Sequence, residues 1–137
     1  MKKFLTIIAL LMAFVTPSLA DKTVYLDVTP SGDVNWPSGA RFALYMYNSS
    51  GNAWTDFELK AGETYIYQAT VPDTYTTIIC VRMNGGTTEN NWNNKWNQTQ
   101  DIDISNYTEV INVKITGWDA ASVSWPSTPA VISSVVL

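Results

Sequence analysis

The stretch Arg41-Phe42-Ala43-Leu44-Tyr45-Met46-Tyr47 decides how this chain is expected to fold. Successive side chains of a strand point to opposite faces, so the parity of each position sorts these residues into two sets. Phe42, Leu44 and Met46 form one apolar face, which we expect to belong to a core. The opposite face carries Arg41 and is expected to meet solvent, as in a half-buried strand of an antiparallel sheet.

A tight hairpin is expected directly after this strand. Asn48-Ser49-Ser50-Gly51 is a run of turn-forming residues, and the next β-prone run covers residues 53–59. Parity places Phe57 and Leu59 of that run on the core side. Three aromatic side chains are then expected to lie together on the outer face of one sheet: Tyr45, Tyr47 and Trp54. Two alternatives remain at this stage, because a loop or the second sheet would cover this face, and a one-residue slip would invert it.

The rest of the sequence continues with short β-prone runs, separated by Gly, Pro, Asn, Asp and Ser. No stretch shows a sustained helical period. The expected strands cover residues 23–28, 41–47, 53–59, 64–71, 75–83, 100–104, 109–116 and 121–125. Seven or eight short strands in about 105 residues predict an all-β fold, a two-sheet β-sandwich of immunoglobulin-like size.

The first twenty residues have the character of a secretory signal peptide. Lys2 and Lys3 precede an apolar run at residues 4–15, and Ser18-Leu19-Ala20 offers small residues at a cleavage site. The expected organisation is a signal peptide at 1–20, one β-sandwich domain at 21–126, and a linker with an apolar tail at 127–137. We therefore expect a secreted protein, extracellular or periplasmic, with no membrane insertion after cleavage. The tail remains open, as a last strand, the start of a further module or a docking segment.

The composition argues against several classes of function. Eight basic and twelve acidic residues give a net charge of −4, and loss of two lysines with the signal peptide leaves −6, which disfavours nucleic acid as a partner. The chain has no histidine, so Ser-His-Asp catalysis, Cys-His catalysis and the common zinc sites are excluded. The single Cys80 lies in an apolar run and is expected to be buried. We expect no catalytic residue, no metal site, no cofactor and no enzymatic activity.

The segment from Asn90 to Thr99 carries two tryptophans and five asparagines in ten residues. Without apolar periodicity it is expected to form a surface loop. Indole rings stack on the C–H faces of sugars, and amides match hydroxyls as donors and acceptors. The side chains expected to contact a sugar there are Trp92, Trp96, Asn93, Lys95 and Gln98. In the alternative reading, the tryptophans tuck under the loop and the asparagines cap turns.

Three further tryptophans lie elsewhere in the chain. Trp118 and Trp125 are expected to pack in the core or at the end of a sheet. Trp36 lies in a turn-rich stretch, and both environments remain open for it.

The order of these features resembles a known family. Arg41 to Tyr47, a Gly-containing turn, Trp54, then Val81-Arg82-Met83-Asn84 and Asn91 to Thr99 together are similar to starch-binding carbohydrate-binding modules of the family 26 type. The resemblance covers roughly residues 23–125. Such modules, found in secreted bacterial polysaccharide-utilisation proteins, are β-sandwiches that pair two tyrosines on one strand with a tryptophan beyond a short turn.

The resemblance implies an α-glucan ligand. The tyrosine pair and tryptophan of the family pattern correspond here to Tyr45, Tyr47 and Trp54, and the family's Asn-Trp-rich loop is similar to Asn91-Trp92-Asn93-Asn94. Family modules usually accompany a catalytic domain on the same chain, and none is visible here. The resemblance therefore implies a free-standing binder, or a partner such as a separate glycoside hydrolase or surface protein.

Two functions follow from the sequence. The first is a non-catalytic, secreted carbohydrate-binding protein that recognises starch or related α-glucans by aromatic stacking. The alternative is a structural or protein-interaction β-sandwich module at the cell surface, whose Asn-Trp loop packs on itself.

Overall fold

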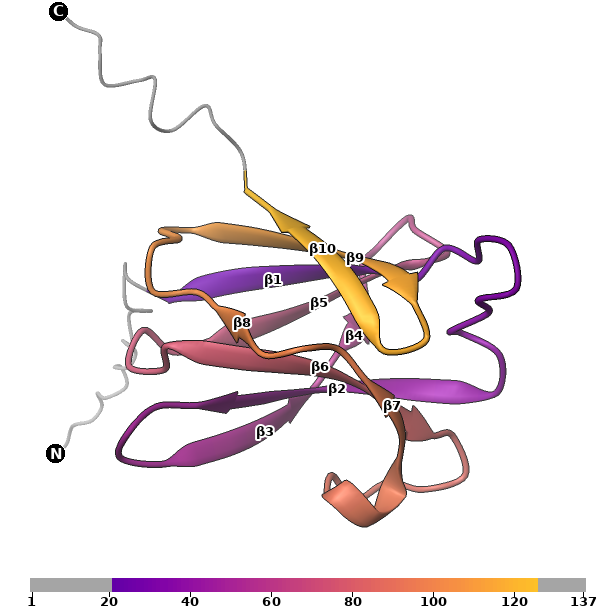
Figure 1. Cartoon of the computed structure of the whole chain (residues 1–137), viewed down its shortest axis with the longest axis horizontal. Helices are drawn as coiled ribbons and strands as arrows, with labels where there is room; N and C mark the ends of the chain where they lie inside the picture. Colours follow the sequence, from indigo (N-terminus) through magenta and orange to yellow (C-terminus); the bar gives the residue numbers. More distant parts are fainter. Residues whose placement is uncertain (1–20, 126–137) are drawn as a thin grey trace, which may run out of the picture.

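The computed structural model describes residues 21–125, and the chain there forms two β-sheets packed face to face (Figure 1). The expected signal peptide and the expected apolar tail lie outside the described residues. The elements are β1 (Lys22–Asp27), β2 (Ala40–Tyr47), β3 (Asn52–Asp56), β4 (Glu58–Leu59), β5 (Ile66–Val71), β6 (Thr77–Asn84), the 3-10 turn η2 (Trp92–Asn94), β7 (Lys95–Gln98), β8 (Ile102–Asp103), β9 (Val110–Gly117) and β10 (Ala120–Ser124). The prediction of an all-β sandwich of two sheets is confirmed.

The first sheet has the strand order β10-β9-β1-β5-β4, and the second has the order β3-β2-β6-β7 with β8 paired to β6. The pairing of β1 with β9 is parallel, whereas the other pairings are antiparallel. Strand β1 therefore sits in the middle of its sheet, between β5 and β9, both of which come much later in the sequence.

The main core fills the space between the sheets. Alternate residues of the longer strands supply it, among them Val24, Leu26, Leu44, Ile78, Ile111 and Val113. Cys80 belongs to this core as expected, and burial raises the pKa of its thiol. Trp36 is fully buried, stacks on Phe42 with ring centroids 5.8 Å apart, and donates its indole N–H to the Trp118 carbonyl.

Two predictions of secondary structure, one of a strand and one of a loop, need correction. The run expected as a single strand at 53–59 divides into β3 and β4, which belong to different sheets. Phe57 is buried at the crossing, but Leu59 is 49 % exposed and is not the core residue that parity suggested. The segment 90–99 was expected to be all loop, whereas its second half forms β7 along the edge of β6.

Side chains close one side of the sandwich, where β7 and β10 meet. The Gln100 amide both donates to the Ala121 carbonyl and accepts from the Ala121 N–H, at 2.9 and 3.1 Å. The Asp119 carboxylate accepts from the Gln98 N–H at 3.3 Å. These contacts tie the β9–β10 hairpin of the first sheet to the edge of the second. No helix within residues 21–125 has the length and apolar character that crossing a membrane requires.

Candidate functional site

The outer face of the second sheet carries the aromatic side chains that strand parity placed there. Tyr45 on β2 stands directly opposite Trp54 on β3, with ring centroids 5.0 Å apart. The ring centroid of Tyr47 lies 5.7 Å from that of Tyr45 on the same strand. The turn also forms as expected, because the Asn48 side chain accepts from two backbone N–H groups at its tip.

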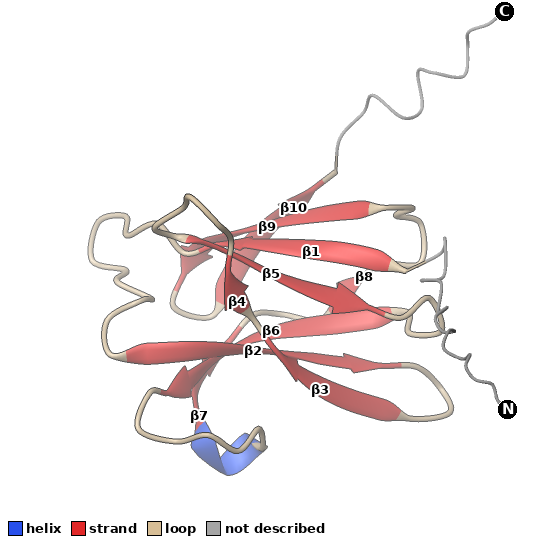
Figure 2. Cartoon of the chain, turned by 180° about the vertical axis from the view of Figure 1, so that it is seen from behind, coloured by secondary structure: helices blue, strands red, loops and turns tan. Residues whose placement is uncertain are grey.

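Trp92 joins these three side chains although it lies 38 positions beyond Trp54 in the printed sequence. Its ring centroid is 4.9 Å from that of Tyr45 and 4.7 Å from that of Trp54, both in edge-to-face contact. Trp92 is 41 % exposed. We call the set of Tyr45, Tyr47, Trp54 and Trp92 the aromatic platform. Figure 2 shows η2, which bears Trp92, on the side of the second sheet that faces away from the first.

The platform rests on a small apolar cluster of its own. Ala43, Ile79, Val81 and Met83 point outward from β2 and β6, yet they are buried under the rings. Tyr45, Tyr47 and Trp54 are consequently half-buried, with their inner surfaces packed and their outer surfaces available. The alternative that a loop covers this face is thus correct for part of it, and the covering loop itself contributes Trp92.

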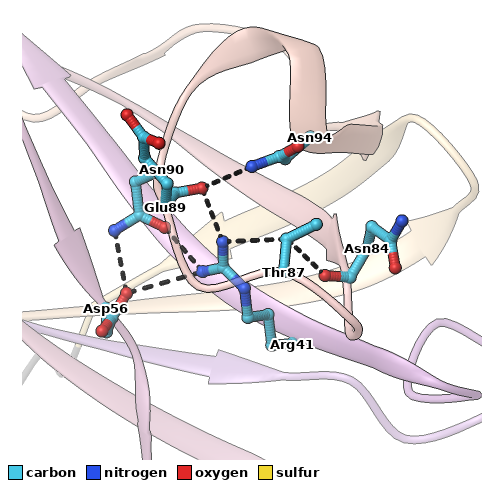
Figure 3. Close-up of polar contacts among 7 residues, drawn as sticks. All are labelled: Arg41, Asp56, Asn84, Thr87, Glu89, Asn90 and Asn94. Carbon is cyan, nitrogen blue, oxygen red and sulfur yellow. Dashed lines mark hydrogen bonds and ion pairs between the residues drawn. The ribbon is translucent and has the colours of Figure 1, made fainter.

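Arg41 fixes that loop to the sheet (Figure 3). Its guanidinium donates to the Asn90 side-chain oxygen at 2.6 Å and to the Glu89 carbonyl at 2.8 Å. It also lies 3.6 Å from the Asp56 carboxylate, to which Asn90 donates a hydrogen bond of 2.8 Å. Strand parity predicted only that Arg41 faces solvent. In the structure, the Arg41 side chain holds the segment before η2 in place.

The asparagines of the loop are used mostly for internal bonds. The Asn91 side chain caps η2 by accepting from the Asn94 N–H at 2.9 Å, and Asn94 donates to the Glu89 carbonyl. The turn-capping alternative is therefore correct for these residues. Asn93 is exposed on η2, beside Trp92. Of the asparagines in the loop, it is the one that sequence analysis assigned to a ligand.

Lys95 and Gln98 lie on β7, close to the platform. The Lys95 ammonium donates to the Gln98 side-chain oxygen at 2.7 Å and stands 5.8 Å from the centre of the Trp92 ring. Gln98 pairs with Val81, which belongs to the apolar cluster beneath the platform. The structure thus places both polar side chains beside the rings.

At the other end of the platform, the Tyr47 hydroxyl donates to the Asp101 carboxylate at 2.7 Å. This hydrogen bond raises the pKa of Tyr47 above its usual value, so the phenol stays neutral well into the alkaline range. Its oxygen retains a lone pair for an incoming donor.

Trp96 does not join the platform. Its ring packs over the guanidinium of Arg82, 4.8 Å from the ring centre, rather than over the tyrosines. The expectation of packed positions for Trp118 and Trp125 is also wrong in part, because 38 % of Trp118 and 48 % of Trp125 remain exposed. Trp125 contacts Tyr107, and Trp118 contacts the same Arg82 guanidinium as Trp96. The surface therefore has separate aromatic clusters.

Replacing Arg41 with methionine is expected to release the loop that bears Trp92. The change removes charge-assisted hydrogen bonds from a partly buried group, so the free energy of unfolding should fall by about 1–3 kcal/mol. Amide hydrogen exchange of residues 85–94 should accelerate relative to the rest of the second sheet. Lys114→Met is the matched control, since the exposed Lys114–Asp27 pair lies on the other sheet. Unchanged exchange in the loop would show that Arg41 does not hold it.

Two grooves lie away from the platform. One of about 360 Å³ opens where β5 approaches β3, and one of about 510 Å³ lies over Tyr25 on the outer face of the first sheet. Neither groove is lined by a residue of the platform.

Comparison of this chain with protein-family models, with curated proteins and with solved structures finds no match. The resemblance to starch-binding modules consequently rests on the residues that carry it and identifies no family. The chain is a β-sandwich of two sheets with aromatic clusters on its surface.

Proposed function

We propose that this protein is a non-catalytic carbohydrate-binding protein that recognises starch or related α-glucans through its aromatic platform. The observation that carries the proposal is the convergence of Tyr45, Trp54 and Trp92 from three separate segments on one outer face. Small soluble proteins rarely gather large aromatic rings at the surface without a binding role.

The shape of the platform favours a curved glycan. Its rings are tilted against one another, by 57° between Tyr45 and Trp54 and by 61° between Trp54 and Trp92. A flat strip of coplanar rings would suit an extended β-linked chain. Tilted rings form a bent surface, and α-linked glucose chains are themselves strongly curved.

Polar groups surround the rings where sugar hydroxyls would lie. Asn93 and Gln98 offer amides, Lys95 offers an ammonium, and Tyr47 offers its phenol oxygen. Amides both donate and accept, as each sugar hydroxyl does. Because binding at an open surface must displace water and order a flexible chain, we expect a dissociation constant of about 10 µM to 1 mM.

The proposal includes the absence of catalysis and export from the cell. The protein would hold a polysaccharide for a separate glycoside hydrolase or a surface protein. A negatively charged chain suits a neutral glycan better than an acidic one, because like charges repel.

Affinity electrophoresis tests the proposal directly. The purified protein should be retarded in a native gel that contains soluble starch and should run normally in a gel that contains a β-glucan. Retardation by the β-glucan alone would retain the carbohydrate-binding function and overturn the α-glucan assignment. Normal migration in both gels would overturn the proposal and point to a protein partner for the platform.

A further inference from the structure

Trp96 and Trp118 stand together around one buried arginine. Trp96 belongs to β7 of the second sheet, and Trp118 belongs to the β9–β10 turn of the first. The Arg82 guanidinium lies over both rings, 4.8 Å from the centre of Trp96 and 5.2 Å from that of Trp118. We call these three side chains the tryptophan–arginine cluster.

The arginine is rigidly held. Arg82 is only 9 % exposed, and its Nε donates to the Trp36 carbonyl at 2.6 Å. Its two terminal nitrogens donate to the Ser38 carbonyl at 2.9 Å and to the Asn97 side-chain oxygen at 3.1 Å. The positions of the two indole rings are thus set by a group that cannot rotate freely.

The rings nevertheless remain open to solvent. Trp96 is 45 % exposed and Trp118 is 38 % exposed, although both have the size and apolar character of core residues. The backbone of Trp118 is anchored as well, because its carbonyl accepts the Trp36 indole N–H at 2.9 Å. Rings fixed before binding lose little freedom when a ligand stacks on them, which favours affinity.

Hydrogen-bonding groups suitable for hydroxyls lie beside the two rings. The exposed Asp119 follows Trp118 directly, and one of its carboxylate oxygens accepts from the Gln98 N–H and, at 3.4 Å, from the Asn97 amide. A carboxylate at this place favours a neutral ligand over an acidic one. Desolvation of the outer ring faces by such a ligand would also strengthen the attraction between each ring and the arginine.

The cluster is distinct from the aromatic platform. The platform lies on the outer face of the second sheet, over Val81 and Met83. Arg82, between them in sequence, points to the opposite face, where it bonds to the backbone around the buried Trp36. Trp92 and Trp96 also belong to different clusters, because Trp92 packs against Trp54 whereas Trp96 packs against Arg82.

We infer that the tryptophan–arginine cluster is a second binding site for a neutral glucan, which makes this protein bivalent toward one polysaccharide. The inference rests on the proposed function, since it extends the same ligand class to a second surface. Two weak sites that engage one long chain reinforce each other, because the second contact becomes intramolecular. A short oligosaccharide gains nothing from this linkage.

The indole N–H signals in a two-dimensional ¹H–¹⁵N spectrum report each site separately, because all six tryptophans lie within the described residues. Titration of the unaltered protein with maltoheptaose should shift the signals of Trp54 and Trp92 for the platform and those of Trp96 and Trp118 for the second site. Trp125, which packs against Tyr107 and belongs to neither site, is the internal control. Single Trp→Phe variants assign the signals.

The pattern of shifts separates the possible failures. Shifts of the Trp54 and Trp92 signals alone would overturn the second site and leave the proposed function intact. Trp96 and Trp118 would then only pack against Arg82 and shield it from solvent. Movement of Trp96 and Trp118 alone would support this site and overturn the platform as the glucan site. No movement beyond that of Trp125 would overturn both.

A variant then tests bivalency. Trp118→Phe, which retains an aromatic ring and spares the backbone contact with Trp36, should weaken binding to soluble starch about tenfold through lost avidity. The midpoint of the maltoheptaose shift at Trp54 should not change, which also shows that the fold is retained. Trp125→Phe is the matched control and should bind starch as the unaltered protein does. Equal starch binding by both variants would overturn bivalency.

Discussion

Replacing Trp54 with alanine is expected to weaken glucan binding by about 30- to 100-fold, which corresponds to 2–3 kcal/mol for a central aromatic contact. Trp54 touches both Tyr45 and Trp92, so its removal opens the middle of the platform. Isothermal titration with maltoheptaose measures the change.

The same substitution should also lower stability, because Trp54 packs on the small apolar cluster beneath the platform. A half-buried indole has part of the packing of a core tryptophan, so we expect the free energy of unfolding to fall by about 1–2 kcal/mol. Urea unfolding separates the two effects. Trp125→Ala is the control, since it removes an exposed tryptophan that contacts Tyr107 instead.

Two results would contradict the role of Trp54. If the variant remains folded and binds maltoheptaose as tightly as the unaltered protein, the platform is not the binding surface. If it is unfolded at room temperature, Trp54 is a structural residue. Trp54→Phe then tests the stacking contribution, because it keeps most of the packing and reduces the ring area offered to a sugar.

Arg82→Met should have the largest effect on stability, a loss of about 3–5 kcal/mol. Methionine fills much of the same volume but donates no hydrogen bond. The buried Trp36 carbonyl would lose its bond of 2.6 Å, and Ser38 and Asn97 would lose theirs. Since a domain of this size is stable by about 5–15 kcal/mol, this variant should be close to unfolding at room temperature.

Chemical denaturation followed by circular dichroism measures this loss, and Arg41→Met is the matched comparison. Both variants exchange arginine for methionine in the same sheet. Arg41 anchors a surface loop, whereas Arg82 donates a hydrogen bond to the backbone carbonyl of the buried Trp36. The loss at position 82 should exceed that at position 41. The opposite order would mean that water replaces the Arg82 guanidinium at little cost.

The hairpin from Arg41 to Asp56 was predictable because its signals are local. Strand parity separated Leu44 and Met46 from Tyr45 and Tyr47. The run of turn-forming residues after Tyr47 predicted that the next strand pairs with this one. The direct pairing of Tyr45 with Trp54 follows from these two observations alone. No information about distant parts of the chain was needed.

The contribution of Trp92 rather than Trp96 was not predictable, because it depends on contacts between segments far apart. Arg41 holds the loop by bonds to Glu89 and Asn90, nearly fifty positions later in the chain. Beyond η2, the chain pairs with β6 and places Trp96 against Arg82. The sequence did offer one signal that was missed, since an arginine inside the apolar run of β6 must find partners for its donors.

The crossing into a second sheet at Phe57 has a similar explanation. A continuous β-prone run allows one long strand, and parity extends the core face to Leu59. Only the position of β5 decides that Glu58 and Leu59 pair with the first sheet while β3 stays with the second.

The central place of β1 has a consequence for how the chain acquires its structure. Thr23 pairs with Val110 in parallel, so the strand that is synthesised first gains one of its two neighbours only when β9 has emerged. Contacts between such distant positions require the closure of a long loop, which slows folding to the millisecond-to-second range that is typical of all-β domains. A nascent chain of this protein therefore cannot complete its first sheet until nearly the whole domain has been made.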